Sequence, residues 1–130
     1  MVEAALIKEI NGGLAYNDQK LTPTIMIKIC SVTDISDNQS KGFDVAGQLF
    51  FIVNKYGKFN AYKNACPHLG IQLEMVPDQF LDSSHSLIQC SMHGALFRIE
   101  DGLCISGPCI EQKLKPVSIE IQGEDIFLVE

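Results

Sequence analysis

The stretch LFFIVNKYGKFNAY, residues 49–62, decides the fold class of this chain. It begins with five consecutive apolar residues at 49–53, a run that is typical of a fully buried strand. A turn follows around Tyr56, Gly57 and Lys58, and residues 58–62 can return along the first strand. The stretch therefore predicts a β-hairpin.

Short runs of the same kind recur on both sides of this hairpin. Val117, Ile119 and Ile121 alternate with polar residues, which is the period of a half-buried strand, and a turn at 123–125 leads into a last strand at 126–129. Further strand-like runs lie at residues 25–30, 86–89 and 95–99. Helix is hard to place except at 3–10 or near 71–75. Many short strands with Gly and Pro between them predict an all-β fold, an antiparallel sandwich or small barrel.

Length and charge limit the domain organisation and the function classes. The 130 residues make one domain, and we expect residues 1–24 to be a peripheral N-terminal extension of a domain at 25–130. A net charge of −6 argues against binding to nucleic acid or to an anionic membrane. The sequence shows neither a long apolar segment nor a secretory signal, so we expect a soluble cytoplasmic protein.

Two short boxes of cysteine and histidine carry the chemistry. The first is CPHLG at 66–70 and the second is CSMHG at 90–94, so each offers one thiolate and one imidazole. Two metal centres use such a set: a single tetrahedral zinc, or a 2Fe–2S cluster held by two cysteines and two histidines. Zinc sites of this composition usually present a cysteine pair before a histidine pair. The interleaved order here favours the cluster, because each of two loops then supplies one ligand to each iron.

These boxes, followed by Gly107-Pro108, resemble the Rieske ferredoxin family over about residues 29–128. The resemblance implies an antiparallel β fold with a small cluster-binding subdomain inserted at about 64–108. It also implies that Cys66 and Cys90 bind the inner iron of one Rieske-type 2Fe–2S cluster, while His68 and His93 bind the outer iron. The Gly107-Pro108 pair looks like the proline loop that covers the cluster in this family.

The remaining cysteines and histidine lie outside the two boxes. Five cysteines without an export signal make a disulfide framework a poor explanation. We expect Cys30 to be a core residue of the first strand and His85 to lie in an exposed loop. Cys104 and Cys109 flank the presumed proline loop, where they can be buried thiols, a redox-active pair or neighbours of the cluster.

The number of available ligand residues limits the functions that this protein can have. A cluster with full protein ligation has no open position for substrate, so the protein is expected to transfer electrons and not to be an enzyme. An oxygenase subunit also needs a mononuclear iron held by two histidines and a carboxylate, but only His85 remains. We expect a carrier whose partners are a flavin reductase and an oxygenase or another redox enzyme. Two alternatives remain: a non-catalytic subunit like the nitrite reductase small subunit, and a redox sensor based on Cys104 and Cys109.

The resemblance also predicts a low reduction potential. High-potential members carry one further cysteine in each box, and the disulfide between them braces the two loops. The corresponding positions here look like Ile71 and Met92. High-potential members also place a serine after the second-box glycine, where this chain has Ala95.

Overall fold

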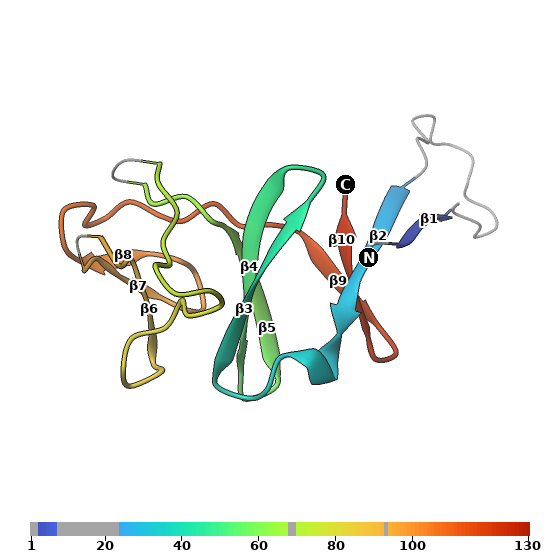
Figure 1. The fold of residues 1–130 in the computed structure, drawn as a ribbon, viewed down its shortest axis with the longest axis horizontal. Helices are drawn as coiled ribbons and strands as arrows, with labels where there is room; N and C mark the ends of the chain where they lie inside the picture. The colour runs from blue at the N-terminus through green and yellow to red at the C-terminus, as the bar shows by residue number, and fades with distance from the viewer. Residues whose placement is uncertain (1–2, 8–23, 68–69, 93) are drawn as a thin grey trace. The chain divides into compact units, whose positions relative to one another are not determined.

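A computed structural model describes residues 3–7, 24–67, 70–92 and 94–130, the first segment and Thr24 by their backbone alone. The described residues form antiparallel strands and one short 3-10 helix, so the predicted all-β class is confirmed (Figure 1). The strands are β1 (Glu3–Ile7), β2 (Thr24–Ser31), β3 (Gln39–Val45), β4 (Gln48–Lys55), β5 (Lys58–Lys63), β6 (Leu87–Gln89), β7 (Leu96–Arg98), β8 (Cys104–Ser106), β9 (Ile119–Gln122) and β10 (Asp125–Val129). The chain divides into two compact units, residues 1–32 with 118–130 and residues 33–117.

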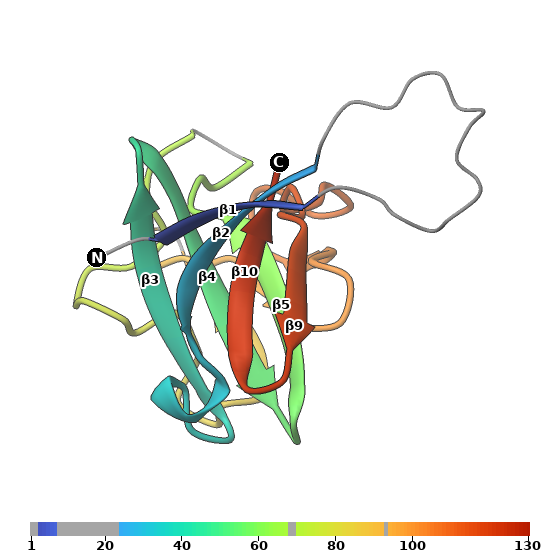
Figure 2. The same cartoon turned by 90° about the vertical axis from the view of Figure 1, so that its right-hand side faces the viewer.

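The unit of residues 1–32 and 118–130 contains one sheet in the order β1-β2-β10-β9, seen face-on in Figure 2. Strands β9 and β10 form the predicted terminal hairpin, with Ile126 and Leu128 buried at alternate positions. The suggestion of a helix at 3–10 was wrong for residues 3–7. Strand β1 pairs in register with β2, from Glu3 opposite Lys28 to Ile7 opposite Thr24. Pairing with a neighbouring strand therefore decided the conformation of this segment.

The unit of residues 33–117 contains two sheets, β3-β4-β5 and β6-β7-β8. Strands β4 and β5 form the predicted hairpin, with Phe51 opposite Tyr62. Its turn has positive φ at both central residues, Tyr56 at 55° and Gly57 at 83°, which matches the twist of the strands it joins. Residues 50–53 are all fully buried, so both faces of β4 are covered.

Strand β3 was not predicted, although it pairs along its whole length with β4. Its sequence, QSKGFDV, has only two apolar side chains, Phe43 and Val45, which are too few for a sustained alternation, and only its last residue is buried. Gly42 lies beneath Phe80, where a Cβ would stand 3.2 Å from the ring. The Phe80 ring in turn stacks on Phe51 with ring centroids 4.3 Å apart. Contacts with distant residues thus hold this strand in place.

One buried cluster of side chains runs through the 33–117 unit. It includes Phe51, Tyr62 and Phe80 together with four of the five cysteines, Cys66, Cys90, Cys104 and Cys109. The fold therefore gathers in one core cysteines that are up to 43 residues apart in the sequence. Within the described part of the chain, no helix is long and apolar enough to cross a membrane.

Candidate metal centre

The described residues of the two boxes form the same pattern of backbone hydrogen bonds. In the first, the Cys66 N–H donates to the Ile71 carbonyl oxygen at 2.7 Å, and the Gly70 N–H donates to the Cys66 carbonyl oxygen at 2.6 Å. In the second, the Cys90 N–H donates to the Ala95 carbonyl oxygen at 2.9 Å, and the Gly94 N–H donates to the Cys90 carbonyl oxygen at 2.9 Å. Each cysteine thus begins a closed loop, and a glycine four residues later helps to close it.

The glycines are required by backbone conformation. Gly70 has a φ of 74° and Gly94 a φ of 70°, in the left-handed region that side chains disfavour. A Cβ built at either position meets no described atom within 4 Å. The turn itself, and not a shortage of space among the described residues, accounts for glycine at the fourth position after each cysteine.

Hydrogen bonds join the second box to the segments that precede and follow the first box. The Ser91 N–H donates to the Leu73 carbonyl oxygen at 2.8 Å, and the Leu73 N–H donates to Oδ1 of Asn64 at 2.8 Å. The Asn64 Nδ2 donates to Oε1 of Glu74 at 2.9 Å. Asn64 is one of two buried polar residues in the described core, and sequence reasoning missed it. Only its position two residues before Cys66 could have drawn attention to it.

The side chains of Cys66 and Cys90 are buried, with 1% and 0% of their surface exposed. His68 and His93, the other two predicted ligands, lie outside the described residues. Among the residues that are described, no group of three or more His, Cys, Asp or Glu side chains is arranged to hold a metal ion. Two buried thiols at equivalent places in two similar loops suit the thiolate ligation that iron–sulfur clusters use.

The predicted proline loop at Gly107-Pro108 belongs to the segment 105–108 between Cys104 and Cys109, and Gly107 lies against Ala95, which directly follows the second box. A Cβ added to Gly107 would stand 2.8 Å from the Cα of Ala95, so glycine permits this close packing. The cysteines at the two ends of this loop are free thiols, and their Sγ atoms are 3.0 Å apart. Burial, followed by the neighbouring sulfurs of Cys104 and Cys66, raises the pKa of the Cys109 thiol to about 12. Cys109 therefore keeps its proton at neutral pH.

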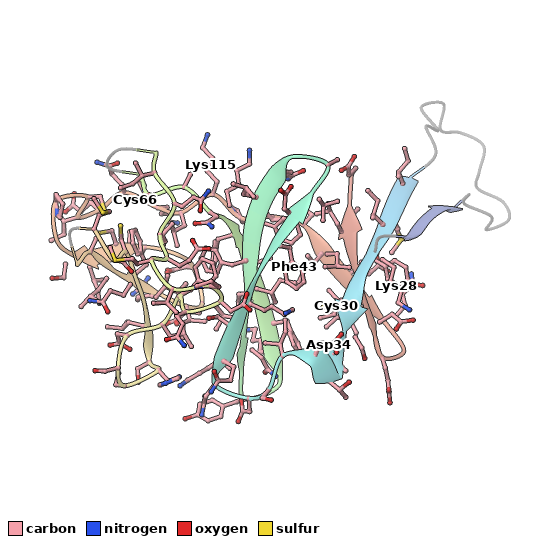
Figure 3. The ribbon with its side chains drawn as sticks, viewed as in Figure 1. Lys28, Cys30, Asp34, Phe43, Cys66 and Lys115 are labelled. Atoms are coloured by element: carbon pink, nitrogen blue, oxygen red, sulfur yellow. The ribbon has the colours of Figure 1, made fainter. Side chains whose placement is uncertain are left out.

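A pocket of about 510 Å³ opens beside the first box. Its lining includes Cys66 and Pro67 together with three exposed lysines, Lys63, Lys113 and Lys115. A backbone bond from the Lys63 N–H to the Lys115 carbonyl oxygen, 2.8 Å long, joins the two segments (Figure 3 labels Cys66 and Lys115). Within the described part of the chain, none of the three lysines forms a salt bridge. This edge of an acidic protein is therefore locally positive.

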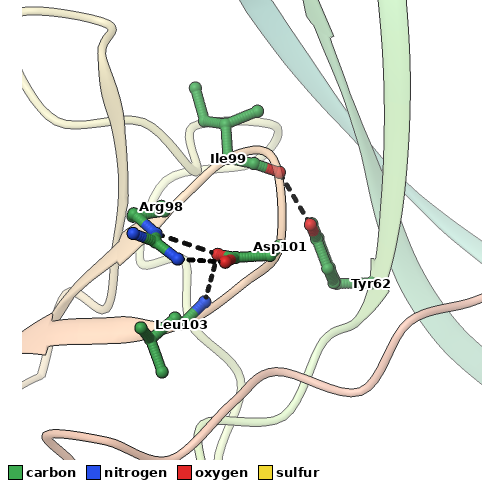
Figure 4. A network of polar contacts seen from close by, with 5 residues as sticks. All are labelled: Tyr62, Arg98, Ile99, Asp101 and Leu103. Atoms are coloured by element: carbon green, nitrogen blue, oxygen red, sulfur yellow. Dashed lines mark hydrogen bonds and ion pairs between the residues drawn. The ribbon is translucent and has the colours of Figure 1, made fainter.

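The turn between β7 and β8 is held by a polar network (Figure 4). The Arg98 guanidinium donates to both carboxylate oxygens of Asp101, and the Leu103 N–H donates to one of them at 3.0 Å. These contacts, with the Arg98 guanidinium first, lower the pKa of Asp101 to about 2. The Tyr62 hydroxyl donates to the Ile99 carbonyl oxygen at 2.7 Å, which attaches the turn to β5. Burial is the main cause that raises the pKa of Tyr62 to about 12.

The remaining histidine and cysteine lie away from the two boxes. His85 is half-buried, not fully exposed as expected, and its Nδ1 lies 2.8 Å from the Asn38 carbonyl oxygen. Its own carbonyl oxygen accepts a bond from Nζ of Lys55 at 2.9 Å. Cys30 is half-buried on β2, in the other unit (Figure 3). These contacts give His85 a structural role in its loop.

Solved structures with the same fold are ferredoxins and ferredoxin–oxygenase complexes. The ferredoxin of carbazole 1,9a-dioxygenase from Nocardioides aromaticivorans IC177 is 19% identical, with a TM-score of 0.65, and the match covers 79% of this chain and 95% of that chain. One chain in the structure of the reduced complex between oxygenase and ferredoxin in carbazole 1,9a-dioxygenase is 23% identical, with a TM-score of 0.68. The match covers 79% of this chain but only 27% of that longer chain. At these identities the likeness establishes the fold alone. No curated protein sequence matches this chain.

A family model identifies the sequence more specifically. The model of the Rieske [2Fe-2S] domain matches residues 25–126, which include both boxes and the Gly107-Pro108 pair. Domains of this family bind a 2Fe–2S cluster, and the buried Cys66 and Cys90 fit that cofactor. This chain belongs to the Rieske [2Fe-2S] domain family.

Proposed function

We propose that this protein is a one-electron carrier that passes electrons between a reductase and an oxygenase or another redox enzyme in the cytoplasm. The observation that carries the proposal is the family match over residues 25–126, nearly the whole described chain. The structural match also covers 95% of the ferredoxin of a dioxygenase, so this chain and that ferredoxin share one domain fold.

The four box residues are the proposed ligands. Cys66 and Cys90 would hold the inner iron through their buried sulfurs, and His68 and His93 would hold the outer iron. When bound, a Rieske-type 2Fe–2S cluster supplies one-electron transfer and leaves no metal position open to substrate. The hydrogen-bonded loops that begin at Cys66 and Cys90 hold the two thiols in fixed positions, which limits reorganisation when the charge changes.

We further propose that the protein has no catalytic activity of its own. Its three histidines cannot supply both the cluster and the two-histidine iron site that oxygenase subunits use. His85 is the one histidine outside the proposed ligand set, and its Nδ1 contacts the Asn38 carbonyl oxygen.

The lysine-lined pocket is the proposed docking site for redox partners. It borders Cys66 and Pro67, so a partner bound there stands next to the first box. Lys63, Lys113 and Lys115 favour an acidic partner surface, because complementary charges accelerate encounter and fix orientation. In the complex of reduced oxygenase and oxidized ferredoxin in carbazole 1,9a-dioxygenase, the fold matches 91% of one chain, and this likeness supports an oxygenase as one such partner.

The first experiment measures iron and acid-labile sulfide in the purified protein. We expect about two of each per chain and a red-brown colour. Cys66→Ser, Cys90→Ser, His68→Ala and His93→Ala should each lose the cluster, whereas His85→Ala should retain it as the matched control. A colourless protein with stoichiometric zinc, after anaerobic reconstitution with iron and sulfide has also failed, would exclude the proposal.

A second experiment tests the proposed extent of the domain. We propose that residues 25–130 hold the cluster and that residues 1–24 are dispensable for it, because both proposed cysteine ligands belong to the 33–117 unit. A chain that begins at Met26 should keep its iron and sulfide content. Loss of the cluster from this shorter chain, while the full chain retains it, would contradict the proposed boundary.

The alternative is a non-catalytic subunit that remains attached to a larger redox enzyme. Purification from the native cell distinguishes the two. A free carrier elutes at the size of this chain alone once high salt has screened its charged contacts. Elution with a large enzyme through high salt would favour the subunit.

A further inference from the structure

Cys104 and Cys109 are two buried thiols in contact with each other, and the proposed electron transfer by the cluster does not use them. The two thiols lie at opposite ends of the 105–108 loop, with their Sγ atoms 3.0 Å apart. The Cys104 thiol also lies 3.3 Å from the Ser106 carbonyl oxygen, which accepts its hydrogen bond. Neither side chain is needed for the two-cysteine, two-histidine ligand set, so their function is open.

The backbone around the pair already holds the two sulfurs together. The Glu111 N–H donates to the Cys104 carbonyl oxygen at 3.0 Å, and the Cys104 N–H donates to Gln112 at 2.8 Å. The Gln112 N–H donates to the Cys109 carbonyl oxygen at 2.8 Å. A disulfide has an S–S distance of about 2.05 Å, so the sulfurs need to approach by only about 1 Å.

The loop between the two cysteines provides a route for a small oxidant. Cys104 and Cys109 are buried, with 1% and 0% of their surface exposed, but all four residues from 105 to 108 are exposed. Local opening of an exposed loop costs far less free energy than global unfolding. A small uncharged molecule can therefore reach the thiols while the rest of the unit stays folded.

We propose that Cys104 and Cys109 form a reversible dithiol–disulfide couple, a second redox site of this protein that reacts with hydroperoxides. Hydrogen peroxide oxidises the sulfur of Cys104, which accepts the hydrogen bond of the Cys109 thiol, to a sulfenic acid and releases one water. The Cys109 sulfur then attacks the sulfenic sulfur and gives up its proton, the S–S bond forms, and a second water leaves with that proton. The two sulfurs lose two electrons in all, and the two peroxide oxygens gain them.

A reducing compartment makes this couple transient. Disulfides in the cytoplasm are usually catalytic or redox-sensing, because cellular thiols return them to the reduced form. In the reverse step, an external dithiol exchanges with the Cys104–Cys109 disulfide and is itself oxidised to a disulfide. The fraction of the Cys104–Cys109 pair in the disulfide form would therefore rise on exposure to peroxide and fall again when thiols reduce it.

The disulfide also constrains a loop that packs on the second box. Gly107 lies so close to Ala95 that no Cβ fits between them, and Ala95 closes the loop that begins at Cys90. A covalent link between the ends of 105–108 makes it harder for this loop to move away. We therefore expect the oxidised form to release iron to a chelator more slowly than the reduced form.

The test exposes the reduced holoprotein to small amounts of hydrogen peroxide, with its visible absorbance recorded to follow the cluster. The free thiols are then alkylated in denaturant, and the peptides are identified by mass spectrometry. The expected product is a single cross-link between Cys104 and Cys109, two hydrogen atoms lighter than the dithiol, which dithiothreitol reverses. This readout does not depend on electron transfer, so it can fail while the proposed function stands.

Matched variants separate the pair from the other cysteines. Cys104→Ser and Cys109→Ser should each abolish the cross-link, whereas Cys30→Ser should leave it unchanged because Cys30 belongs to the other unit. The proposal would be overturned if, in wild-type protein with intact cluster absorbance, Cys104 and Cys109 were each found alkylated and not cross-linked. A cross-link that forms only through Cys66 or Cys90 would overturn it as well. Both results come from the wild-type chain and do not require any variant to fold.

Discussion

The hydroxyl group of Tyr62 donates a 2.7 Å hydrogen bond to the carbonyl oxygen of Ile99. Tyr62 lies on β5, and Ile99 follows β7, so this bond joins the two sheets of the 33–117 unit. The Tyr62 ring also covers Gly102 in the same turn, where an added Cβ would stand 2.9 Å from the ring. One side chain thus supports the β7–β8 turn from the hairpin that precedes the first box.

Tyr62→Phe tests the hydrogen bond. The variant keeps the ring but leaves the Ile99 carbonyl oxygen without this donor, so we expect the free energy of unfolding to fall by about 1 kcal/mol. Chemical denaturation at neutral pH measures the change. Tyr56→Phe is the control, because Tyr56 is 76% exposed and should be neutral. Equal effects of the two substitutions would show that the bond to Ile99 does not stabilise the fold.

Alkaline pH provides a second measure of the same residue. Tyr62 has a pKa of about 12 in the folded protein against about 10 when unfolded. Above pH of about 10 the unfolded chain loses a proton that the folded chain retains, so stability falls as pH rises from about 10 to about 12. Denaturation across this range should show that decline in wild-type protein, and a smaller one in Tyr62→Phe. If the free energy of unfolding fell equally with pH in the two proteins, the raised pKa of Tyr62 would be contradicted.

Gly102→Ala tests the space beneath the Tyr62 ring. Gly102 has a φ of 72°, so alanine introduces backbone strain as well as the clash with Tyr62. Gly47→Ala is the matched control, because Gly47 has a φ of 84° and an added Cβ there meets nothing within 4 Å. We expect Gly47→Ala to cost about 1 kcal/mol from strain and Gly102→Ala about 1–3 kcal/mol more. Denaturation midpoints that fall equally would rule out the steric contribution.

Small inorganic oxidants test the charge beside the first box. If electrons leave near Lys113 and Lys115, ferricyanide, an anion, should oxidise the reduced protein more slowly as ionic strength rises, despite the net charge of −6. Lys113→Gln and Lys115→Gln should each slow this reaction at low salt, and Lys58→Gln, at the far hairpin turn, should not. Stopped-flow absorbance measures the rates. Ferricyanide oxidation that accelerates with salt would place the electron exit at a negative surface.

The reduction potential should lie near about −150 mV and not near about +300 mV. Ala95, directly after Gly94, is fully buried and has no hydroxyl group with which to stabilise the more negative reduced state. Ser91 and Ser106 are both exposed, although either could still donate from its side chain. Voltammetry at neutral pH measures the midpoint, and Ala95→Ser should raise it. A wild-type midpoint above about +100 mV would contradict the prediction.

Local sequence pattern alone determined the all-β class, the hairpins at residues 49–62 and 117–129, and the two boxes that identify the family. Each of these depends on residues close together in the chain: an apolar run, a turn with glycine, or a cysteine and histidine a few positions apart. The Rieske family model confirms what the order of the boxes predicted. The role of Cys66, Cys90, His68 and His93 as ligands remains a prediction from that pattern.

Only the tertiary structure decided how distant segments meet. Strand β3 has too few apolar residues for a sustained alternation. It forms because it pairs with β4 and because Phe80 covers Gly42. The bond from Tyr62 to Ile99 spans 37 positions. Cys104 and Cys109 are close in sequence, yet their 3.0 Å approach depends on how the chain returns after residue 108. Such contacts depend on packing and hydrogen bonds formed after the chain has folded back on itself, and no short window of sequence contains both partners with their geometry.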